Sequence, residues 1–440
     1  MSLFGMRSCS VSTTGRSLMG ETRRHPMPWG LGPAVATLLL TTVAGAQQEE
    51  GQGSTDWPAM ISRLKQQAYA RPGHAHTHQQ LAVAYNNYGV ELSNQGQWEL
   101  AVQQFQEALR LHSSDEQVQK NLGNVYLHQA QEAHGRHDFA GAVAMLEKAI
   151  ALDPDLAQAY VLLGKVEYDR QRLKEAKAAW QRALELDPTQ QALAERLDQV
   201  TEELPVESKF DRLSQAYFDL RYEEHLERPV GFDVRDALLS ARRLVGSDFS
   251  YWPTYKLVVL IYGAESFRQL REETPEWLGG QFDGKIRVPL PSEQLAQGMV
   301  KNILFHEYTH ALIHDLTNGR CPKWLNEGLA EYEGRTQSSP PLRLLAKAHE
   351  AQRLIPWLEL SERFSPALPS EEVGLAYEQS YSLVAYLIQR YGFWRIRRVL
   401  KAIAGGQAWE EALAQEVRRK LPRVEEDWRD WLPELLAPAR

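Results

Sequence analysis

The sequence predicts a multidomain protein: an all-α solenoid of stacked helix pairs, followed by an α+β domain whose carboxy-terminal part is helical. Small and large apolar residues recur at a period of about 34 residues in the first half, which is typical of stacked helix pairs. The second half has short apolar runs typical of strands, and then apolar residues at helical spacing. At 440 residues the chain is long enough for two or three domains with their own cores.

The amino terminus has the parts of a secretory signal. Arg23 and Arg24 precede an apolar stretch from Leu31 to Val43, and Ala44-Gly45-Ala46 matches a small-residue cleavage pattern. We therefore expect residues 1–46 to be a signal peptide that is cleaved near Ala46, so that the mature protein is exported (periplasmic or secreted). An uncleaved membrane anchor is the less favoured alternative, because the apolar stretch is short for a transmembrane span. We expect no stable membrane span in the mature chain.

Three stretches of the first half align with one another, and the second has about seven extra residues around His128 to His134. Each has a glycine, then two alanines around a large residue. The pattern resembles the tetratricopeptide repeat (TPR), in which each helix pair buries its apolar face against its neighbours. The marker residues are Gly89, Ala101, Phe105 and Ala108; Gly123, Ala142, Leu146, Ala149 and Pro154; and Gly164, Ala176, Trp180, Ala183 and Pro188.

Changes in pattern suggest the domain boundaries. We expect the TPR solenoid with its flanking helices at residues 56–203, since Asp56-Trp57-Pro58 is a good helix start. A flexible leader at 47–55 precedes it, and a linker at 204–209 leads to a second domain at 210–440. Arrays of this kind have a concave face that binds a peptide or a partner protein, and we expect the same here. The alternative is that the array only packs on the second domain, as a spacer or lid.

The second domain opens with strands. Phe218 to Tyr222 and Lys256 to Tyr262 are apolar runs rich in β-branched and aromatic residues. Gln281 to Val288 is typical of a hairpin that turns at Asp283-Gly284. Further along, an apolar helical run opens at Ala376 to Tyr381.

One helix of the second domain carries a metal-binding pattern. His306-Glu307-Tyr308-Thr309-His310 places two histidines one helical turn apart, where two imidazole nitrogens can hold one metal ion. Glu307 points off that face, so its carboxylate can take a proton from a water that the metal activates. The alternative is an amphipathic core helix whose histidines are only packed or solvated. Polar groups on an otherwise apolar face need partners, however, and a metal with a water supplies them.

This motif and the segment Trp324-Leu325-Asn326-Glu327-Gly328-Leu329-Ala330-Glu331-Tyr332 resemble the gluzincin zinc metallopeptidases, in particular the peptidase MA-like family. The resemblance covers roughly Phe210 to Trp431 and implies an α+β, thermolysin-like fold. It implies Zn²⁺ held by His306, His310 and Glu327, with a fourth position open for water or substrate.

The resemblance implies further roles. Glu331 would orient a ligand histidine, although a solvated helix acid is the alternative. Related enzymes have a tyrosine at the start of a downstream helix that donates a hydrogen bond to the oxyanion of the tetrahedral intermediate. Tyr377 is our candidate, Tyr381 is its rival one turn later, and a core tyrosine is the alternative. The chain has no GAMEN-like stretch, with which aminopeptidase-N-like enzymes hold a free amino terminus, so we expect internal cleavage. We expect the substrate to pair in extended form with an exposed strand edge at Lys285 to Leu290.

The sequence therefore predicts an exported zinc metallopeptidase, an endopeptidase rather than an aminopeptidase, with Glu307 and Tyr377 as catalytic residues. Its substrate is a peptide or protein, and the repeats bind that substrate or a partner protein. A formal net charge of −8 without a basic stripe argues against nucleic-acid binding. A catalytically silent scaffold for envelope protein assembly is the alternative, although the intact set of histidines and acids argues against it. Hydrolysis of a non-peptide amide is a third hypothesis.

Overall fold

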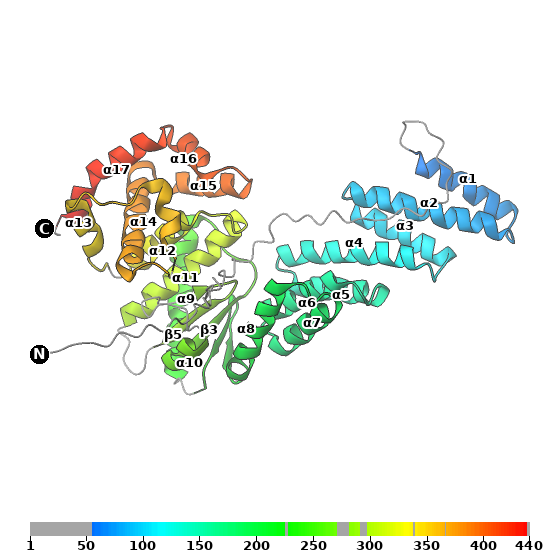
Figure 1. The fold of residues 1–440 in the computed structure, drawn as a ribbon, viewed down its shortest axis with the longest axis horizontal. Helices are drawn as coiled ribbons and strands as arrows, with labels where there is room; N and C mark the ends of the chain where they lie inside the picture. The colour runs from blue at the N-terminus through cyan, green and yellow to red at the C-terminus, as the bar shows by residue number, and fades with distance from the viewer. Residues whose placement is uncertain are drawn as a thin grey trace, which may run out of the picture.

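The computed structural model describes residues 55–224, 228–270, 281–290, 297–337, 339–365 and 367–437. A helical array occupies residues 57–207, and a mixed region of strands and helices follows (Figure 1). This architecture confirms the predicted fold class. The predicted signal peptide, and residues 47–54 of the predicted leader, lie outside the described residues. No described helix is both long enough and apolar enough to cross a membrane.

Consecutive helices of the array pack as pairs, α2 with α3, α4 with α5 and α6 with α7. The marker glycines lie where the two helices of a pair cross. A Cβ on Gly89 would lie 2.8 Å from the ring of Phe105, and a Cβ on Gly164 would lie 2.2 Å from the ring of Trp180. The array consists of α1 (Trp57–Ala70), α2 (Ala75–Asn94), α3 (Trp98–Leu111), α4 (Glu116–Gly135), α5 (Phe139–Leu152), α6 (Ala157–Asp169), α7 (Leu173–Leu186) and α8 (Gln191–Glu207).

The predicted insertion lengthens one helix. α4 has 20 residues, whereas α6, at the corresponding place in the next repeat, has 13. Because about seven residues make two helical turns, the added residues keep the same face of α4 toward its neighbours. The insertion therefore extends the end of α4, while the turn to α5 is as long as the turn from α6 to α7.

The sheet of the described residues has five strands in the order β1-β2-β3-β5-β4. β2, β3 and β5 are parallel, and β1 and β4 add antiparallel at the two edges. The predicted strands and the hairpin are confirmed. The predicted free edge at Lys285 to Leu290 is correct only in part. β5 pairs with β3 on one side, and on the other side β4 covers Ile286 and Arg287, while no described strand pairs with Val288 to Leu290 on that side. The strands are β1 (Asp211–Ser214), β2 (Phe218–Tyr222), β3 (Leu257–Gly263), β4 (Gln281–Phe282) and β5 (Ile286–Leu290).

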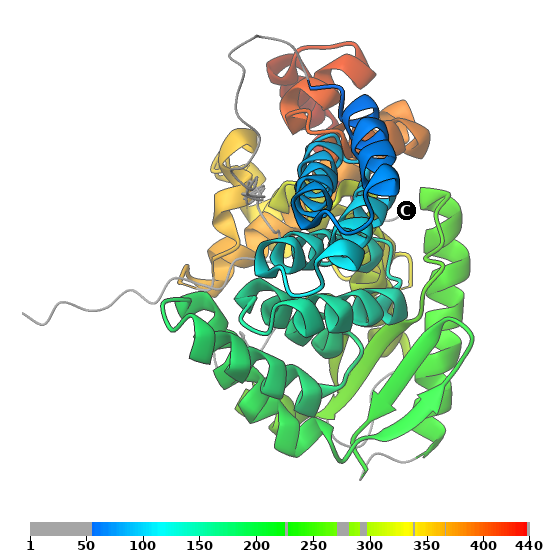
Figure 2. The ribbon, with the colours of Figure 1, turned by 90° about the vertical axis from the view of Figure 1, so that its right-hand side faces the viewer.

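The two faces of the sheet have different partners, because successive side chains of a strand point to opposite faces. In β3, Leu257, Val259 and Ile261 join the large core that includes α9 (Arg228–Phe249) and α11 (Gln297–Thr317). Val258, Leu260 and Tyr262 point the other way, toward α10 (Ala264–Leu270) and the end of the array. The sheet therefore lies between the core of the second domain and α8, which Figures 1 and 2 show beside it.

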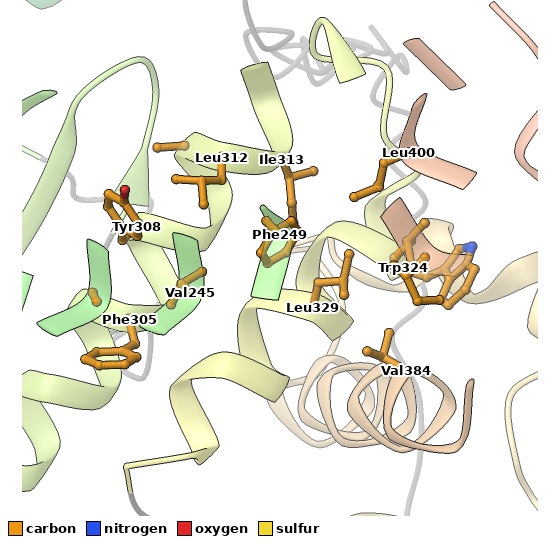
Figure 3. Packing of buried hydrophobic residues seen from close by; sticks show 14 of the residues in the cluster. Val245, Phe249, Phe305, Tyr308, Leu312, Ile313, Trp324, Leu329, Val384 and Leu400 are labelled. Carbon is orange, nitrogen blue, oxygen red and sulfur yellow. The ribbon is translucent and has the colours of Figure 1, made fainter. Parts of the chain in front are cut away.

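The large core continues into the carboxy-terminal helices. Figure 3 shows Phe249 of α9 near Ile313 of α11, with Trp324 and Leu329 of α12 near Val384 of α14. α14 begins at Ser370, almost two turns before the predicted start, because acidic residues in its first turn suit a helix amino terminus. The remaining elements are α12 (Lys323–Arg335), α13 (Arg343–Glu350), η1 (Trp357–Arg363), α14 (Ser370–Tyr391), α15 (Phe393–Ala404), α16 (Trp409–Val417) and α17 (Leu421–Leu436).

The junction between the two parts differs from the predicted linker at 204–209. α8 continues to Glu207, so most of that segment is helical. The reason is a buried contact: Glu207 is 3% exposed, and its carboxylate lies 2.5 Å from the guanidinium of Arg287 in β5. The end of α8 is therefore held on the sheet by an ion pair that the sequence pattern does not reveal.

Candidate metal centre

Two helices bring the predicted metal-binding residues together. α11 carries His306, Glu307 and His310. It ends at Thr317, and Asn318 and Gly319 follow with positive φ values of 51° and 70°. Such left-handed residues are common just after the end of a helix. The chain then turns back at once into α12, which carries Glu327 over the histidines.

α12 approaches its neighbours closely through its glycine. A Cβ on Gly328 would lie 2.6 Å from the backbone oxygen of Ser380 in α14. A side chain at this position would push α12 away from α14 and move the neighbouring Glu327. The close packing of α12 against α14 therefore requires a glycine at position 328.

The three predicted ligand atoms form a compact triangle. Nε2 of His306 and Nε2 of His310 are 3.1 Å apart, and Oε2 of Glu327 lies 3.5 Å from the first and 3.4 Å from the second. Zinc bonds of about 2.0–2.1 Å in a tetrahedral arrangement place two ligand atoms about 3.3 Å apart. The triangle therefore fits one zinc ion, and these residues could hold a metal.

Two buried carboxylate oxygens of the site have no hydrogen-bond partner among the described residues. They are Oε2 of Glu327 and Oε2 of Glu307. Both side chains are only 3% exposed. Buried polar atoms normally have partners, because leaving them without one costs free energy. A cation at the triangle and a water beside it would satisfy both oxygens.

The outer nitrogen of each histidine faces an oxygen acceptor. Nδ1 of His310 is 3.0 Å from Oδ1 of Asn326, and Nδ1 of His306 is 3.4 Å from Oε1 of Glu331. Arg335 in turn donates to Glu331 at 2.9 Å. Such contacts fix the ring orientation and leave Nε2 free to face a metal. The sequence suggested this role for Glu331 but missed Asn326, although Asn326 directly precedes Glu327.

The two oxygens of Glu327 have separate surroundings. Oε1 lies 2.7 Å from the ammonium of Lys323, one turn earlier, while Oε2 faces the histidines. Burial alone would raise the pKa of Glu327, but Lys323 and the histidines hold it well below its usual range. Glu327 is therefore an ionised ligand candidate that presents one oxygen to the centre. Lys323 was also missed from the sequence, because nothing in the motif singles it out.

The two candidate tyrosines have different surroundings. Burial, and then the charges of Glu327, Glu331 and Glu307, raise the pKa of Tyr377 well above its usual value. Its phenol therefore stays protonated at neutral pH. Tyr381 instead packs against Arg335, whose guanidinium lies 4.8 Å from the centre of its ring.

Comparisons with known proteins support both parts of the chain. The Peptidase MA superfamily profile matches residues 252–434, and tetratricopeptide repeat profiles match residues 81–113 and 133–197. The protein O-mannosyl-transferase Tmtc3 of Drosophila melanogaster is 28% identical over 116 residues, which are 26% of this chain and 11% of that protein. The Hsp70-Hsp90 organizing protein of Triticum aestivum is 25% identical over 166 residues, 38% of this chain and 26% of that protein. The chain thus spans a minor part of either relative.

Solved structures of TPR domains are also similar to part of this chain. The Arabidopsis OM64 TPR domain is 22% identical and covers 28% of this chain and 96% of its own, with a TM-score of 0.22. The first TPR of Spaghetti (RPAP3), bound to an HSP90 peptide, is 23% identical and covers 29% of this chain and 95% of its own, with the same TM-score of 0.22. Residues 252–434 belong to the Peptidase MA superfamily, and tetratricopeptide repeats precede them in the same chain.

Proposed function

We propose that this protein is an exported, zinc-dependent peptidase that hydrolyses internal peptide bonds of a peptide or protein substrate. The observation that carries the proposal is the triangle of ligand atoms from His306, His310 and Glu327, with the buried carboxylate of Glu307 beside it. The match to the Peptidase MA superfamily supports peptide hydrolysis as the reaction. The signal-like stretch that ends near Ala46 supports export.

Each group of the centre has its own role in the proposed reaction. Zinc would supply a Lewis acid that polarises the scissile carbonyl and acidifies a water. Glu307 takes the proton from the attacking water and then passes it to the leaving amine nitrogen as the C–N bond breaks. Tyr377 keeps its proton and donates a hydrogen bond to the oxyanion that forms on the carbonyl oxygen.

The repeat array would bind the substrate or a partner protein. TPR arrays stack into a superhelix with an extended concave surface, which suits a segment of a polypeptide. Binding at that surface would raise the concentration of a tethered substrate at the metal centre. The match of residues 81–113 and 133–197 to TPR profiles supports this role.

Glu307→Gln tests the proposal, because glutamine has almost the same shape but cannot accept the proton at neutral pH. The zinc content should stay at the wild-type level while hydrolysis of amino-blocked peptides falls by about a hundredfold or more. Glu350→Gln, at an exposed position on α13, is the matched control and should keep full activity. Residual activity within about tenfold of wild type would remove Glu307 from this role. A zinc-loaded wild type that cleaves no peptide would instead indicate a silent scaffold.

A further inference from the structure

A cavity of about 350 Å³ lies between the repeat array and the sheet, apart from the metal centre. The end of α6, the turn after it, the strands β1 and β2 and the start of β3 form its walls. We propose that this cavity binds a small phosphate-bearing anion. Its charged lining residues are Arg170, Arg172, Arg212, Arg221, Lys256, Asp169 and Asp219.

Asp219 is fully engaged by two of the arginines. It is 6% exposed, and its Oδ1 accepts a hydrogen bond from Nε of Arg212 at 2.5 Å. Its Oδ2 accepts another from Nη2 of Arg221 at 3.1 Å. One carboxylate charge is therefore shared by two guanidinium groups, and both of its oxygens are occupied. Asp219 holds the two cations in the wall without cancelling their combined charge.

Asp169, the second carboxylate of the lining, pairs with two residues that do not line the cavity. It lies 2.7 Å from Nε2 of His134 and 3.1 Å from Nζ of Lys165. Burial alone would raise the pKa of Asp169, but Lys165 and His134 lower it to about 2. Asp169 is therefore ionised at neutral pH, and its charge is matched by groups outside the lining.

Of the remaining cations, Arg172 and Lys256 have the weaker partners. Glu167 lies 2.9 Å from Arg170 but 3.9 Å from Arg172, whose side chain is 52% exposed. Lys256 donates to the hydroxyl of Ser214 at 3.0 Å and forms no ion pair within the described part of the chain. Five cationic side chains thus face two carboxylates of the lining and Glu167 beside it, a surplus of two positive charges. This positive hollow lies in a chain with a net charge of −8.

The arrangement favours a phosphate group over a carboxylate. A phosphate ester carries a charge of about −1.5 to −2 near pH 7 and has three acceptor oxygens, whereas a carboxylate carries one charge in a plane. The donors come from four separate segments, so acceptors that point in different directions suit them. Arginine adds paired donors for such oxygens. The volume is within the range of about 300–1,000 Å³ that is typical of small-molecule sites, and it leaves room for the organic part of a phosphate ester.

The cavity lies along a seam where the array contacts the sheet and the metal-binding helix. Arg221 donates to the backbone oxygen of Gln171 at 3.3 Å. Near Phe139 of the lining, the ring of His137 stacks on Tyr255 with ring centres 3.5 Å apart, and its Nε2 lies 3.6 Å from Oδ1 of Asp315 on α11. An anion that bridges the two walls would therefore stabilise the docked arrangement of the array.

Titration calorimetry on the full chain tests the proposal with phenyl phosphate as the probe and benzoate as a carboxylate of similar size. Phenyl phosphate should bind saturably, and benzoate at least about tenfold more weakly. The double variant Arg172→Gln/Lys256→Gln removes two exposed charges and should raise the Kd for phenyl phosphate at least about tenfold. The double variant Lys347→Gln/Lys401→Gln, which changes the charge equally at exposed sites of α13 and α15, should bind like wild type.

Three results would overturn the proposal. They are no saturable binding of phenyl phosphate by wild type, equal affinity for benzoate, and undiminished binding in Arg172→Gln/Lys256→Gln. The last result would also place the anion elsewhere, for example at the metal centre, which neither substitution touches. Circular dichroism should show the same helical content in all three proteins.

Discussion

Arg287 joins the repeat array to the strand that precedes the metal-binding helix. Its side chain has no exposed surface, and its guanidinium nitrogens lie 2.5 Å from an oxygen of Glu207 and 3.3 Å from oxygens of Glu203 and Asp283. The same guanidinium donates to the hydroxyl of Tyr168 at 2.7 Å. Because Glu203, Glu207 and Tyr168 belong to the array, this cluster links the two parts through buried charges.

We predict that Arg287→Met lowers the free energy of unfolding by about 3–5 kcal/mol. Removing one partner of a buried ion pair leaves the other charges without compensation, and this loss exceeds the net contribution of the intact pair. Glu203 and Glu207, with side chains that have no exposed surface, would then face each other across the vacated position. The triple variant Arg287→Met/Glu203→Met/Glu207→Met removes these charges and should recover at least half of the lost stability, because apolar replacement of a whole buried ion cluster is often neutral.

Urea unfolding at a constant zinc concentration, followed by circular dichroism and tryptophan fluorescence, measures these changes through the midpoint and the slope of the transition. Arg429→Met is the matched control. Arg429 pairs with Glu425 on the surface of α17, and its loss should change stability by no more than about 0.5 kcal/mol. An Arg287→Met protein within about 1 kcal/mol of wild type would refute the reasoning, as would a triple variant no more stable than Arg287→Met.

Three further predictions concern the centre and its supports. Burial raises the pKa of Glu333 from 4.5 to about 8, so its contribution to stability is fully present below pH 4.5 and is lost as the pH rises toward 8. Glu333→Gln should therefore stabilise the protein by about 3 kcal/mol at pH 7 and hardly at all at pH 4, as urea unfolding at the two pH values would show; a gain that is equal at both would contradict this. Asn326→Ala should weaken zinc binding about 10- to 100-fold in a chelator competition, because His310 loses the acceptor that orients its ring; an unchanged affinity would assign Asn326 no such role. Tyr377→Phe should lower kcat about a hundredfold with zinc content unchanged, while Tyr381→Phe stays close to wild type; the reverse order would give the oxyanion role to Tyr381.

The histidine motif and its helix could be predicted because their geometry is local. One helical turn separates His306 from His310, and the stop at Asn318 and Gly319 follows from backbone preferences alone. The family resemblance implied that Glu327 lies near the two histidines. In the structure this follows because the chain turns back into α12 directly after α11. Local pattern is therefore enough when the partners lie close together in sequence.

The contacts between the two parts could not be predicted in this way. Lys285 and Arg287 look like ordinary polar residues of a hairpin, yet both are fully buried. Lys285 donates to the side chain of Gln171 at 2.6 Å, across 114 positions of sequence. Burial lowers the pKa of Lys285 to about 8. Such partners depend on how α6 and α8 dock on the sheet, and neither periodicity nor composition contains that information.

This docking changes how the role of the repeats can be tested. A truncation after Glu203 would remove Glu203 and Tyr168, two of the partners of Arg287, and would cut α8 beside the face of the sheet that includes Leu260 and Tyr262. Loss of activity after such a truncation would then reflect damage to the sheet as well as loss of a binding surface. Single substitutions on the exposed surface of the array, in the full chain, separate these two effects.

The central claim is that His306, His310 and Glu327 hold one zinc ion. Mass spectrometry of the metal content, after dialysis of the purified chain against metal-free buffer, tests it directly. We predict about one zinc ion per chain in wild type and in Glu307→Gln, and loss of stoichiometric zinc in His310→Ala, because water does not replace the lost imidazole bond equally well. Stoichiometric zinc in His310→Ala, or a wild type that binds none, would contradict the account.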